Sequence, residues 1–305
     1  MIPNLPKKNK LTFSTGSPKD DETVYLFKDA IAIYSLRSIG NHGFSPVVRV
    51  RRDSDNSEKD FSANEVHSNV LVDFVGSGNG GFVETWYDQS GNGNHLIQAT
   101  GTKQPSIVTS GALNKRNNRP IVKFIQANEN NLTNANTNMF PTGSNIAATV
   151  FQAMHIDSSS GNRLGIFGSN GGGNNASANG YRFGSGTSRR VIIKFANASA
   201  TQVEFNSSSL SNNADSILTY LFTANGGTGT LQVFNNGSAQ AEVSKSITDQ
   251  SYGPSHVSSG LILGARTVSD NFSDSEFFEV IAYDSNQTSN RVLIETNMND
   301  TYNIF

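Results

Sequence analysis

Cysteine is absent from this chain of 305 residues, so the chain can form neither a disulfide nor a thiolate metal site. Charged residues amount to only 16%, and the formal net charge of -2 at pH 7 provides no basic surface for nucleic acid. No apolar run approaches the roughly 18 residues of a membrane-spanning helix, and no basic amphipathic helix is present for a lipid surface. We therefore expect neither nucleic acid nor a membrane among the partners.

Motifs for cofactors and metals are also scarce. Segment 76–81 matches the Gly-x-Gly-x-x-Gly pattern of dinucleotide sites, but it follows a predicted helix and precedes a strand, the reverse of the order required. The acidic segment Asp53–Asp60 has oxygens at alternate positions, yet Glu58 stands where an EF-hand loop needs glycine. We interpret this segment as a hairpin turn closed by side-chain hydrogen bonds, with a bound calcium ion left as the alternative. The histidines show no zinc-ligand spacing; they are His42, His67, His95, His155 and His256. We predict no cofactor and no metal.

The first 24 residues form a polar segment with Pro3, Pro6, Pro18 and a lysine-rich stretch that ends at Lys10. This segment lacks the apolar core of a signal peptide, which predicts synthesis without secretion. Polar terminal arms of this kind become ordered where they dock onto a neighbouring subunit. We therefore expect residues 1–24 to be an anchoring or assembly arm and residues 25–305 to be a single domain.

Glycine, asparagine, serine and threonine are abundant, as in chains with many turns between short strands. The Asn235-Asn-Gly237 segment is typical of a tight hairpin. Apolar patterns of strand length predict strands over residues 82–87, 149–156, 164–168, 190–195, 216–224, 230–235, 260–264 and 276–283. The predicted fold class is all-β, a sandwich of two sheets.

Three helices are expected beside these strands. Residues 25–38 have apolar side chains at helical spacing. Ser62 and Glu65 form a capping-box pattern that predicts a helix over residues 63–74. The C-terminal segment 288–302 has a helical apolar pattern, with Asn286 or Ser289 as its cap.

The run from Phe82 to His95 joins a strand, which carries the only tryptophan, to a loop of Asp, Asn and Gly. Trp86 lies between apolar neighbours in mid-strand, so we interpret it as a core residue rather than a ligand platform. A carboxylate at the strand exit can accept the N–H groups of the following turn, and glycine and asparagine tolerate positive φ. The predicted structural loop consists of Asp88, Gly91, Asn92, Gly93, Asn94 and His95.

This loop and three flanking segments resemble the catalytic domain of fungal-type α-L-arabinofuranosidase B. They resemble equally the concanavalin A-like (laminin-G-like) domains of phage tail and capsid-fibre proteins and of bacterial glycan-binding proteins. The segments are 32–37, 48–56, 87–96 and 118–124, in the order found in the family. The resemblance implies a concanavalin A-like jelly-roll sandwich of two antiparallel sheets with a few short helices.

The resemblance also allows the catalytic carboxylates of that family to be sought here. In the best match, Lys194 and Ala196 stand where the family has an aspartate and its nucleophile, and Val268 stands at the general acid. The adjacent cysteine pair of the family's sugar pocket is absent. A shifted alignment would leave Glu204 or Asp270 as a catalytic carboxylate.

These substitutions lead us to expect a non-enzymatic virion structural protein, such as a phage head fibre, capsid decoration or tail-fibre component, located in the virion. Its partners are expected to be other virion proteins, bound through the arm, and a cell-surface glycan. A homo-oligomer, a trimer by resemblance, is expected. A glycoside hydrolase related to α-L-arabinofuranosidase and a bacterial glycan-binding module remain as alternatives. The candidate glycan-binding residues are Tyr181, Arg182, Asn197 and Asp270, and each is equally a simple loop or strand-end residue.

Overall fold

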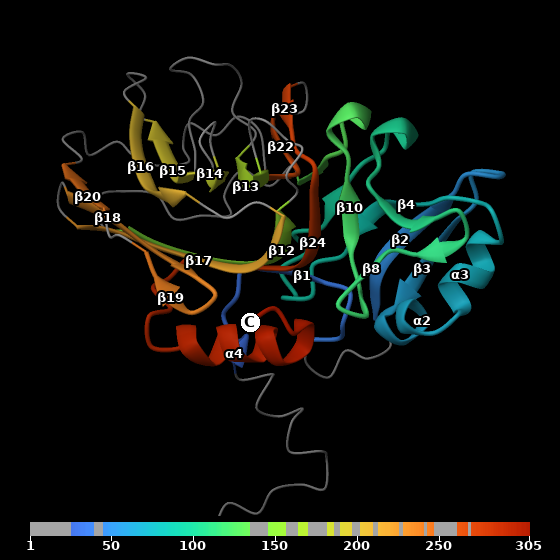
Figure 1. Ribbon diagram of the computed structural model, residues 1–305, viewed down its shortest axis with the longest axis horizontal. Helices are drawn as coiled ribbons and strands as arrows, with labels where there is room; N and C mark the ends of the chain where they lie inside the picture. The colour runs from blue at the N-terminus through green and yellow to red at the C-terminus, as the bar shows by residue number, and fades with distance from the viewer. Residues whose placement is uncertain are drawn as a thin grey trace, which may run out of the picture.

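Twenty strands of the described part of the chain form one hydrogen-bonded antiparallel network, which folds into two sheets packed face to face (Figure 1). A computed structural model describes residues 26–39, 45–134, 146–156, 164–169, 182–185, 190–196, 202–209, 213–225, 228–240, 243–246, 261–267 and 270–305. The all-β sandwich predicted from the sequence is confirmed.

One sheet, here called the helix-side sheet, has β24 next to β12, then β17, then β18. Strands β1 and β10 share the other edge of β24, and β19 and β20 share the outer edge of β18. Its strands are β1 (Ala32–Ser35), β10 (Val122–Phe124), β12 (Ile146–Ile156), β17 (Ala214–Asn225), β18 (Thr228–Asn235), β19 (Ser238–Ala239), β20 (Val243–Ser246) and β24 (Ser275–Tyr283).

The other sheet, here called the outer sheet, runs in the order β3, β2, β4, β5, β11, β21, β13, β14, β15, β16. Strand β6 pairs with β4, β7 and β10, and so joins the two sheets. Its strands are β2 (Pro46–Arg52), β3 (Glu58–Ser62), β4 (Gly81–Trp86), β5 (Leu96–Ile97), β6 (Ser106–Thr109), β7 (Ala112–Leu113), β11 (Leu132–Asn134), β13 (Leu164–Ser169), β14 (Arg182–Ser185), β15 (Arg190–Ala196), β16 (Gln202–Ser209) and β21 (Leu261–Leu263).

The remaining elements are short hairpins and helices. The two small hairpins are β8 (Lys115–Arg116) with β9 (Arg119–Pro120), and β22 (Ala265–Thr267) with β23 (Asp270–Phe272). The helices are α2 (Ala63–His67), α3 (Val70–Val75), α4 (Arg291–Tyr302) and the 3-10 turns η1 (Gly101–Lys103) and η2 (Gln126–Asn128). No helix in the described part of the chain is long and apolar enough to cross a bilayer.

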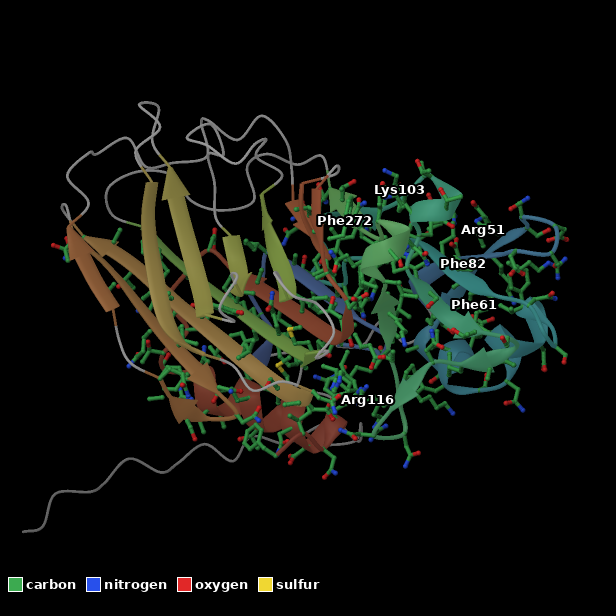
Figure 2. All side chains as sticks on the ribbon, turned by 45° about the horizontal axis from the view of Figure 1, so that its top comes forward. Arg51, Phe61, Phe82, Lys103, Arg116 and Phe272 are labelled. Carbon is green, nitrogen blue, oxygen red and sulfur yellow. The ribbon has the colours of Figure 1, made fainter. Side chains whose placement is uncertain are left out.

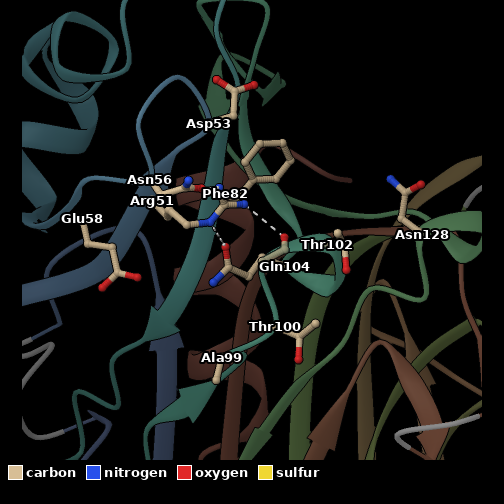
Figure 3. A pocket seen from close by; sticks show the side chains of 11 residues that line it. Arg51, Asp53, Asn56, Glu58, Phe82, Ala99, Thr100, Thr102, Gln104 and Asn128 are labelled. Atoms are coloured by element: carbon tan, nitrogen blue, oxygen red, sulfur yellow. Dashed lines mark hydrogen bonds between the residues drawn. The ribbon is translucent and has the colours of Figure 1, made fainter.

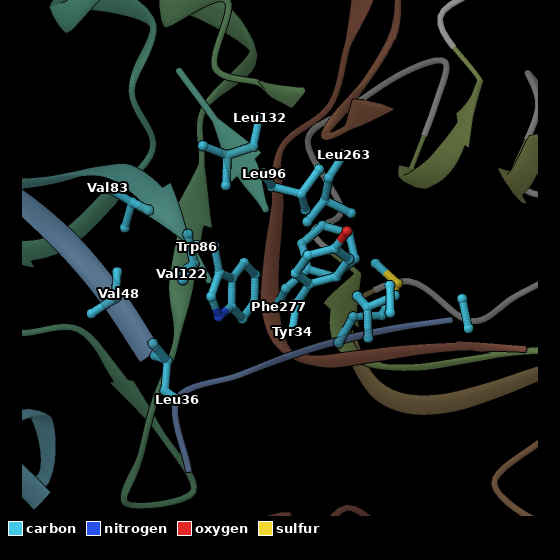
Figure 4. Close-up of a cluster of buried hydrophobic side chains, with 14 of the residues drawn as sticks. Tyr34, Leu36, Val48, Val83, Trp86, Leu96, Val122, Leu132, Leu263 and Phe277 are labelled. Carbon is cyan, nitrogen blue, oxygen red and sulfur yellow. The ribbon is translucent and has the colours of Figure 1, made fainter. Parts of the chain in front are cut away.

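Each face of the helix-side sheet covers a separate apolar core. Between the sheets, Trp86 and Tyr34 are fully buried with ring centroids 6.2 Å apart, in the cluster of Figure 4. Helix α4 lies on the opposite face of this sheet (Figure 1). Its Ile294 and Met298 are buried in the second core. The prediction that Trp86 is a core residue is confirmed.

The helix expected over residues 25–38 is wrong, because its central part is strand β1. Ala32–Ser35 pairs with β24, and all four residues are buried. Tyr34 belongs to the core between the sheets, whereas Ile33 belongs to the core under α4. A strand that is buried on both faces has no polar side, so its apolar residues also match a helical spacing.

The helix expected over residues 63–74 is present but divided. Its capping box is confirmed: the Ser62 hydroxyl accepts the Glu65 N–H at 3.4 Å, and the Glu65 carboxylate accepts the Ser62 N–H at 2.9 Å. The break lies at Ser68, whose hydroxyl donates to the Glu65 carbonyl and accepts the Val70 N–H. Such local bonds compete with the helical ladder and end α2 early.

Two further expectations concern turns and helix ends. The Asn236-Gly237 turn connects β18 to β19 with φ of 51° and 75°, as a two-residue hairpin loop with two positive φ angles requires. Helix α4 begins at Arg291 with Asn290 at the N-cap position. The predicted caps Asn286 and Ser289 therefore precede the true boundary.

Candidate functional site

Of the four ligand-binding residues proposed from the sequence, Arg182 and Asp270 lie in described strands. Tyr181 and Asn197 lie outside the described residues. Arg182 is the first residue of β14, and its backbone lies opposite Gly168 of β13. Asp270 is the first residue of β23 and lies opposite Thr267. The site formed by these four residues stays a prediction.

Of the three residues at the resemblance-based catalytic positions, Lys194 and Ala196 lie on one strand, and Val268 lies outside the described residues. Lys194 and Ala196 are in β15, and β15 pairs with β16. Lys194 lies directly opposite Glu204 in this pairing. Glu204 is therefore the carboxylate residue nearest in register to the strand that the resemblance associates with the nucleophile.

The Asp88 carboxylate organises the predicted structural loop. Its Oδ1 accepts the N–H groups of Ile33 and Ser90, both at 2.9 Å, and its Oδ2 accepts the Asn94 N–H at 2.9 Å. The ring nitrogen Nδ1 of His95 accepts the Asp88 N–H at 3.0 Å. These bonds join the loop to β1.

The asparagines of the same loop continue this attachment. The Asn92 amide donates to the Ala30 carbonyl at 3.0 Å, and the Asn94 amide donates to the Ile31 carbonyl at 2.8 Å. Gly91 and Gly93, which are exposed, have φ of 89° and 73°. In the described structure the loop therefore serves to hold β1 and the end of β4 together.

A surface hollow of about 760 Å³ lies elsewhere, where the turn between β2 and β3 meets β4 and η1 (Figure 3). This volume is in the range of small-molecule sites. We call it the Arg51 hollow, after the side chain in its middle. Figure 2 shows Arg51, Phe82 and Lys103 at the same end of the molecule. Its lining residues are Arg51, Asp53, Asn56, Glu58, Phe82, Ala99, Thr100, Gly101, Thr102, Gln104 and Asn128.

The Arg51 guanidinium is held by oxygens on three sides. It donates from Nε to Gln104 Oε1 at 2.7 Å, from Nη1 to Asn56 Oδ1 at 2.8 Å and from Nη2 to the Gly101 carbonyl at 3.1 Å. The guanidinium carbon lies 5.1 Å from the centre of the Phe82 ring, a cation–π contact. A Cβ at Gly101 would lie 3.3 Å from the guanidinium, so the small residue allows this close packing.

Further hydrogen bonds hold Gln104, one partner of Arg51, and the rim residue Asp53 in place. Gln104 is 2% exposed, and its amide nitrogen donates to the Gln98 carbonyl at 2.8 Å. Asp53 accepts the Gly80 N–H at 2.9 Å on the rim. Arg51, Gln104 and Asp53 are therefore held in place by protein contacts before any ligand arrives.

Charge in the hollow is negative overall. Arg51 is its single cation, and Asp53 and Glu58 are its two carboxylates. Among the described residues, neither carboxylate forms an ion pair, whereas the nearby Lys103 pairs with Glu129 at 2.7 Å. An anionic ligand therefore meets two unneutralised carboxylates beside one guanidinium that already has three oxygen partners.

The segment Asp53–Asp60 forms a hairpin turn, as we interpreted it from the sequence. Asp55 forms a bidentate ion pair with Arg52 and accepts the Ser57 N–H at 2.9 Å. Asp60 accepts from Arg49 at 2.7 Å and from the Tyr87 hydroxyl at 2.8 Å. Within the described ranges, no group of three or more His, Asp or Glu side chains is arranged to hold a metal ion.

Sequence reasoning missed the Arg51 hollow. The alternation of Val48 and Val50 with Arg49 and Arg51 is the available signal, because it places both arginines on the outer face of β2. The partner Gln104 follows more than 50 residues later, after a 3-10 turn. No local pattern predicts that such distant segments meet.

Comparisons with known proteins show a shared fold. No protein-family model matches the sequence, and no curated protein matches it. A GH54 α-L-arabinofuranosidase variant soaked with 4-nitrophenyl α-L-arabinofuranoside superposes with a TM-score of 0.61 and 16% identity over 90% of this chain. An arabinofuranosidase complexed with arabinofuranosyl-α-1,2-xylobiose gives 0.56 and 18% over 87% of this chain. A GH54 α-L-arabinofuranosidase soaked with a cyclic sulfate inhibitor gives 0.51 and 17% over 90%.

This chain spans 62–64% of the length of those three structures, so they contain further parts that it does not match. The comparisons correct our expectation of a non-enzymatic virion structural protein. That expectation is wrong, because the similar structures are arabinofuranosidases and give no support to a phage or fibre role. At these identities the similarity establishes one conclusion, that the chain has the sandwich fold found in α-L-arabinofuranosidases.

Proposed function

We propose that this chain is a carbohydrate-active domain related to glycoside hydrolases, with α-L-arabinofuranosides as its substrates. The observation that carries this proposal is the likeness of fold to arabinofuranosidases over nine tenths of the chain. A fold alone does not determine chemistry. Hydrolysis therefore also requires carboxylates in this chain that are placed to carry the reaction.

Glycoside hydrolysis uses two carboxyl groups, about 5–5.5 Å apart in retaining enzymes and about 6.5–9.5 Å apart in inverting ones. Glu204, opposite Lys194, supplies one carboxylate of the outer sheet. A nucleophile or general base in such a reaction is an ionised carboxylate. We propose Glu204 as the residue for that role.

Asp270 is the second carboxylate that the sequence offers, on the β22–β23 hairpin beside β13. Strands β14 and β15 lie between β13 and β16 (Figure 1). With neighbouring strands about 4.8 Å apart, three strand steps amount to about 14 Å along the sheet. This spacing from β13 to β16 exceeds the separation that a hydrolytic pair needs, so the strand pairing does not bring Asp270 and Glu204 together as partners.

This separation, together with Ala196 and Val268 at the resemblance-based catalytic positions, favours a second candidate function. That function is binding of an arabinofuranose-containing glycan without cleavage. Both candidates share the ligand class and differ only in turnover.

The test is incubation of the full chain with 4-nitrophenyl α-L-arabinofuranoside, with released 4-nitrophenol as the readout. The hydrolase proposal expects turnover that falls by at least about a hundredfold in Glu204→Gln, since catalytic carboxylates contribute effects of this order. Asn64→Ala, an exposed change in α2, is the matched control. Absence of turnover with retained binding to an arabinan resin would instead establish the binding function.

A further inference from the structure

We propose that the Arg51 hollow is a binding site for a neutral, hydroxyl-rich sugar unit and discriminates against acidic sugars. The inference rests on the proposed carbohydrate-active function. It assigns a ligand chemistry to a place in the fold that the sequence had marked only as an acidic turn.

The exposed side chains of the hollow match the hydrogen-bonding needs of a sugar. Thr102 and Asn128 are exposed, and their side chains make no hydrogen bond within the described structure. A hydroxyl both donates and accepts, and an amide offers two donors and an acceptor. A sugar hydroxyl also donates and accepts hydrogen bonds. It can therefore replace the water bound to these side chains without leaving a polar group unpaired.

The middle of the hollow is rigid before binding. Arg51 uses three of its N–H groups on Gln104, Asn56 and Gly101, which leaves two for a ligand. Its guanidinium packs between Phe82 and Gly101, so it cannot turn freely. Preorganised donors lower the entropic cost of binding.

Phe82 adds an apolar surface to these polar groups. The ring lines the hollow next to Asp53 and Arg51, and it is partly exposed (Figure 3). The Arg51 guanidinium covers one face of the ring, so Phe82 offers its exposed part as apolar surface. A pocket that combines apolar surface with a few placed polar groups is suited to a ligand with both C–H groups and hydroxyls. A sugar ring has this composition.

The charges of the hollow oppose an acidic ligand. A uronate carboxylate would approach Asp53 and Glu58, which have no cationic partner within the described residues. The one cation, Arg51, shares the hollow with these two carboxylates, so the summed charge of the lining stays negative. Repulsion between like charges at short range lowers the affinity for an acidic ligand. A neutral ligand in the same place meets no such repulsion.

The experiment is titration calorimetry of the full chain with arabinotriose and with trigalacturonate, at low ionic strength. We expect arabinotriose to bind and trigalacturonate to bind at least about tenfold more weakly. Asn128→Ala and Thr102→Ala each remove one hydrogen-bonding group, so each should weaken arabinotriose binding about two- to tenfold. Asn64→Ala, outside the hollow, should bind like the original chain.

Glu58→Lys tests the charge argument separately. The ratio of the dissociation constants of trigalacturonate and arabinotriose should fall by at least about threefold, because the substitution replaces a repelling carboxylate with a cation. No binding of arabinotriose, equal binding of the two sugars, or unchanged binding in both Asn128→Ala and Thr102→Ala would each overturn the inference. The calorimetric signal requires no hydrolysis, so absence of 4-nitrophenol release contradicts the hydrolase proposal without affecting the result for the hollow.

Discussion

Glu279, whose side chain is fully buried in β24, accepts two hydrogen bonds from the Arg37 guanidinium, at 2.8 Å and 2.9 Å. The Tyr302 hydroxyl donates to the same carboxylate at 2.8 Å, which joins the end of α4 to the sheet. Burial, and then the charge of Glu279, raise the pKa of Tyr302 well above its usual value. The pair is therefore a fixed connection between the segment after β1, β24 and the C-terminal helix.

Glu279→Gln should destabilise the domain by roughly 3–5 kcal/mol, because it leaves the Arg37 guanidinium without its counter-charge in a buried place. Urea unfolding followed by circular dichroism measures the change. Asp55→Asn breaks the exposed Arg52 pair and should have a far smaller effect. Equal losses in the two variants would contradict the structural role of Glu279.

Gly264→Ala should cost roughly 2–5 kcal/mol of unfolding free energy through two additive penalties. Gly264 has φ of 86°, where an L side chain costs about 1–2 kcal/mol, and overpacking a core costs about 1–3 kcal/mol. A Cβ there would overlap the Phe124 ring, which packs edge-on against Phe277 at 5.5 Å.

Gly91→Ala is the control for this change, because Gly91 has φ of 89° and no atom near the added Cβ. Its cost of about 1–2 kcal/mol reports the backbone penalty alone. Thermal unfolding of both variants should show the larger loss for Gly264→Ala. Equal losses would mean that Phe124 moves aside freely and would contradict the overpacking argument.

Asp88→Asn should destabilise the domain by about 1–3 kcal/mol. Both oxygens of Asp88 accept N–H groups, and the substitution turns one of them into an amide donor that faces other donors. Hydrogen exchange should show faster opening at Ile33 and Asn94. Asp73→Asn, on an exposed helical position without such contacts, should leave both amides protected.

Protonation of Asp60 should account for part of the stability that the domain loses in acid. The hydrogen bonds from Arg49, and secondarily from Tyr87, hold the pKa of Asp60 below its ordinary value of 3.8, while partial burial opposes them. Because the folded-state pKa is the lower one, the stabilisation is present above pH 3.8 and is lost as pH falls through the folded-state value. Asp60→Asn should therefore show a shallower loss of stability below pH 3.8 in acid unfolding. An unchanged slope would show that the pair contributes nothing.

Much of the fold was predictable because it rests on local patterns. The four long strands of the helix-side sheet (β12, β17, β18 and β24), the Asn236-Gly237 turn and the Ser62–Glu65 cap all follow from spacing or from backbone preference. Strand β1 was missed for a physical reason. Its pairing with β24, nearly 250 residues away, decides its conformation, and burial on both faces removes the alternation that marks a strand.

The Arg51 hollow was not predictable, and the virion role was predicted wrongly. The hollow depends on contacts of Arg51 with Gln104 and Gly101, which lie about 50 residues later in the sequence. A local sequence pattern does not predict contacts over such a separation. The functional error came from giving more weight to substitutions at Lys194 and Ala196 than to the shared scaffold.

By themselves, the residues determined the class of the molecule: an all-β sandwich without thiol chemistry, with turns at Asn-Gly pairs and a tryptophan in its core. Tertiary structure alone decided which polar side chains face one another, as Arg37 with Glu279 and Arg51 with Gln104. The reason is that strand preference and burial depend on near neighbours, whereas a site is made where distant segments are brought together by sheet pairing.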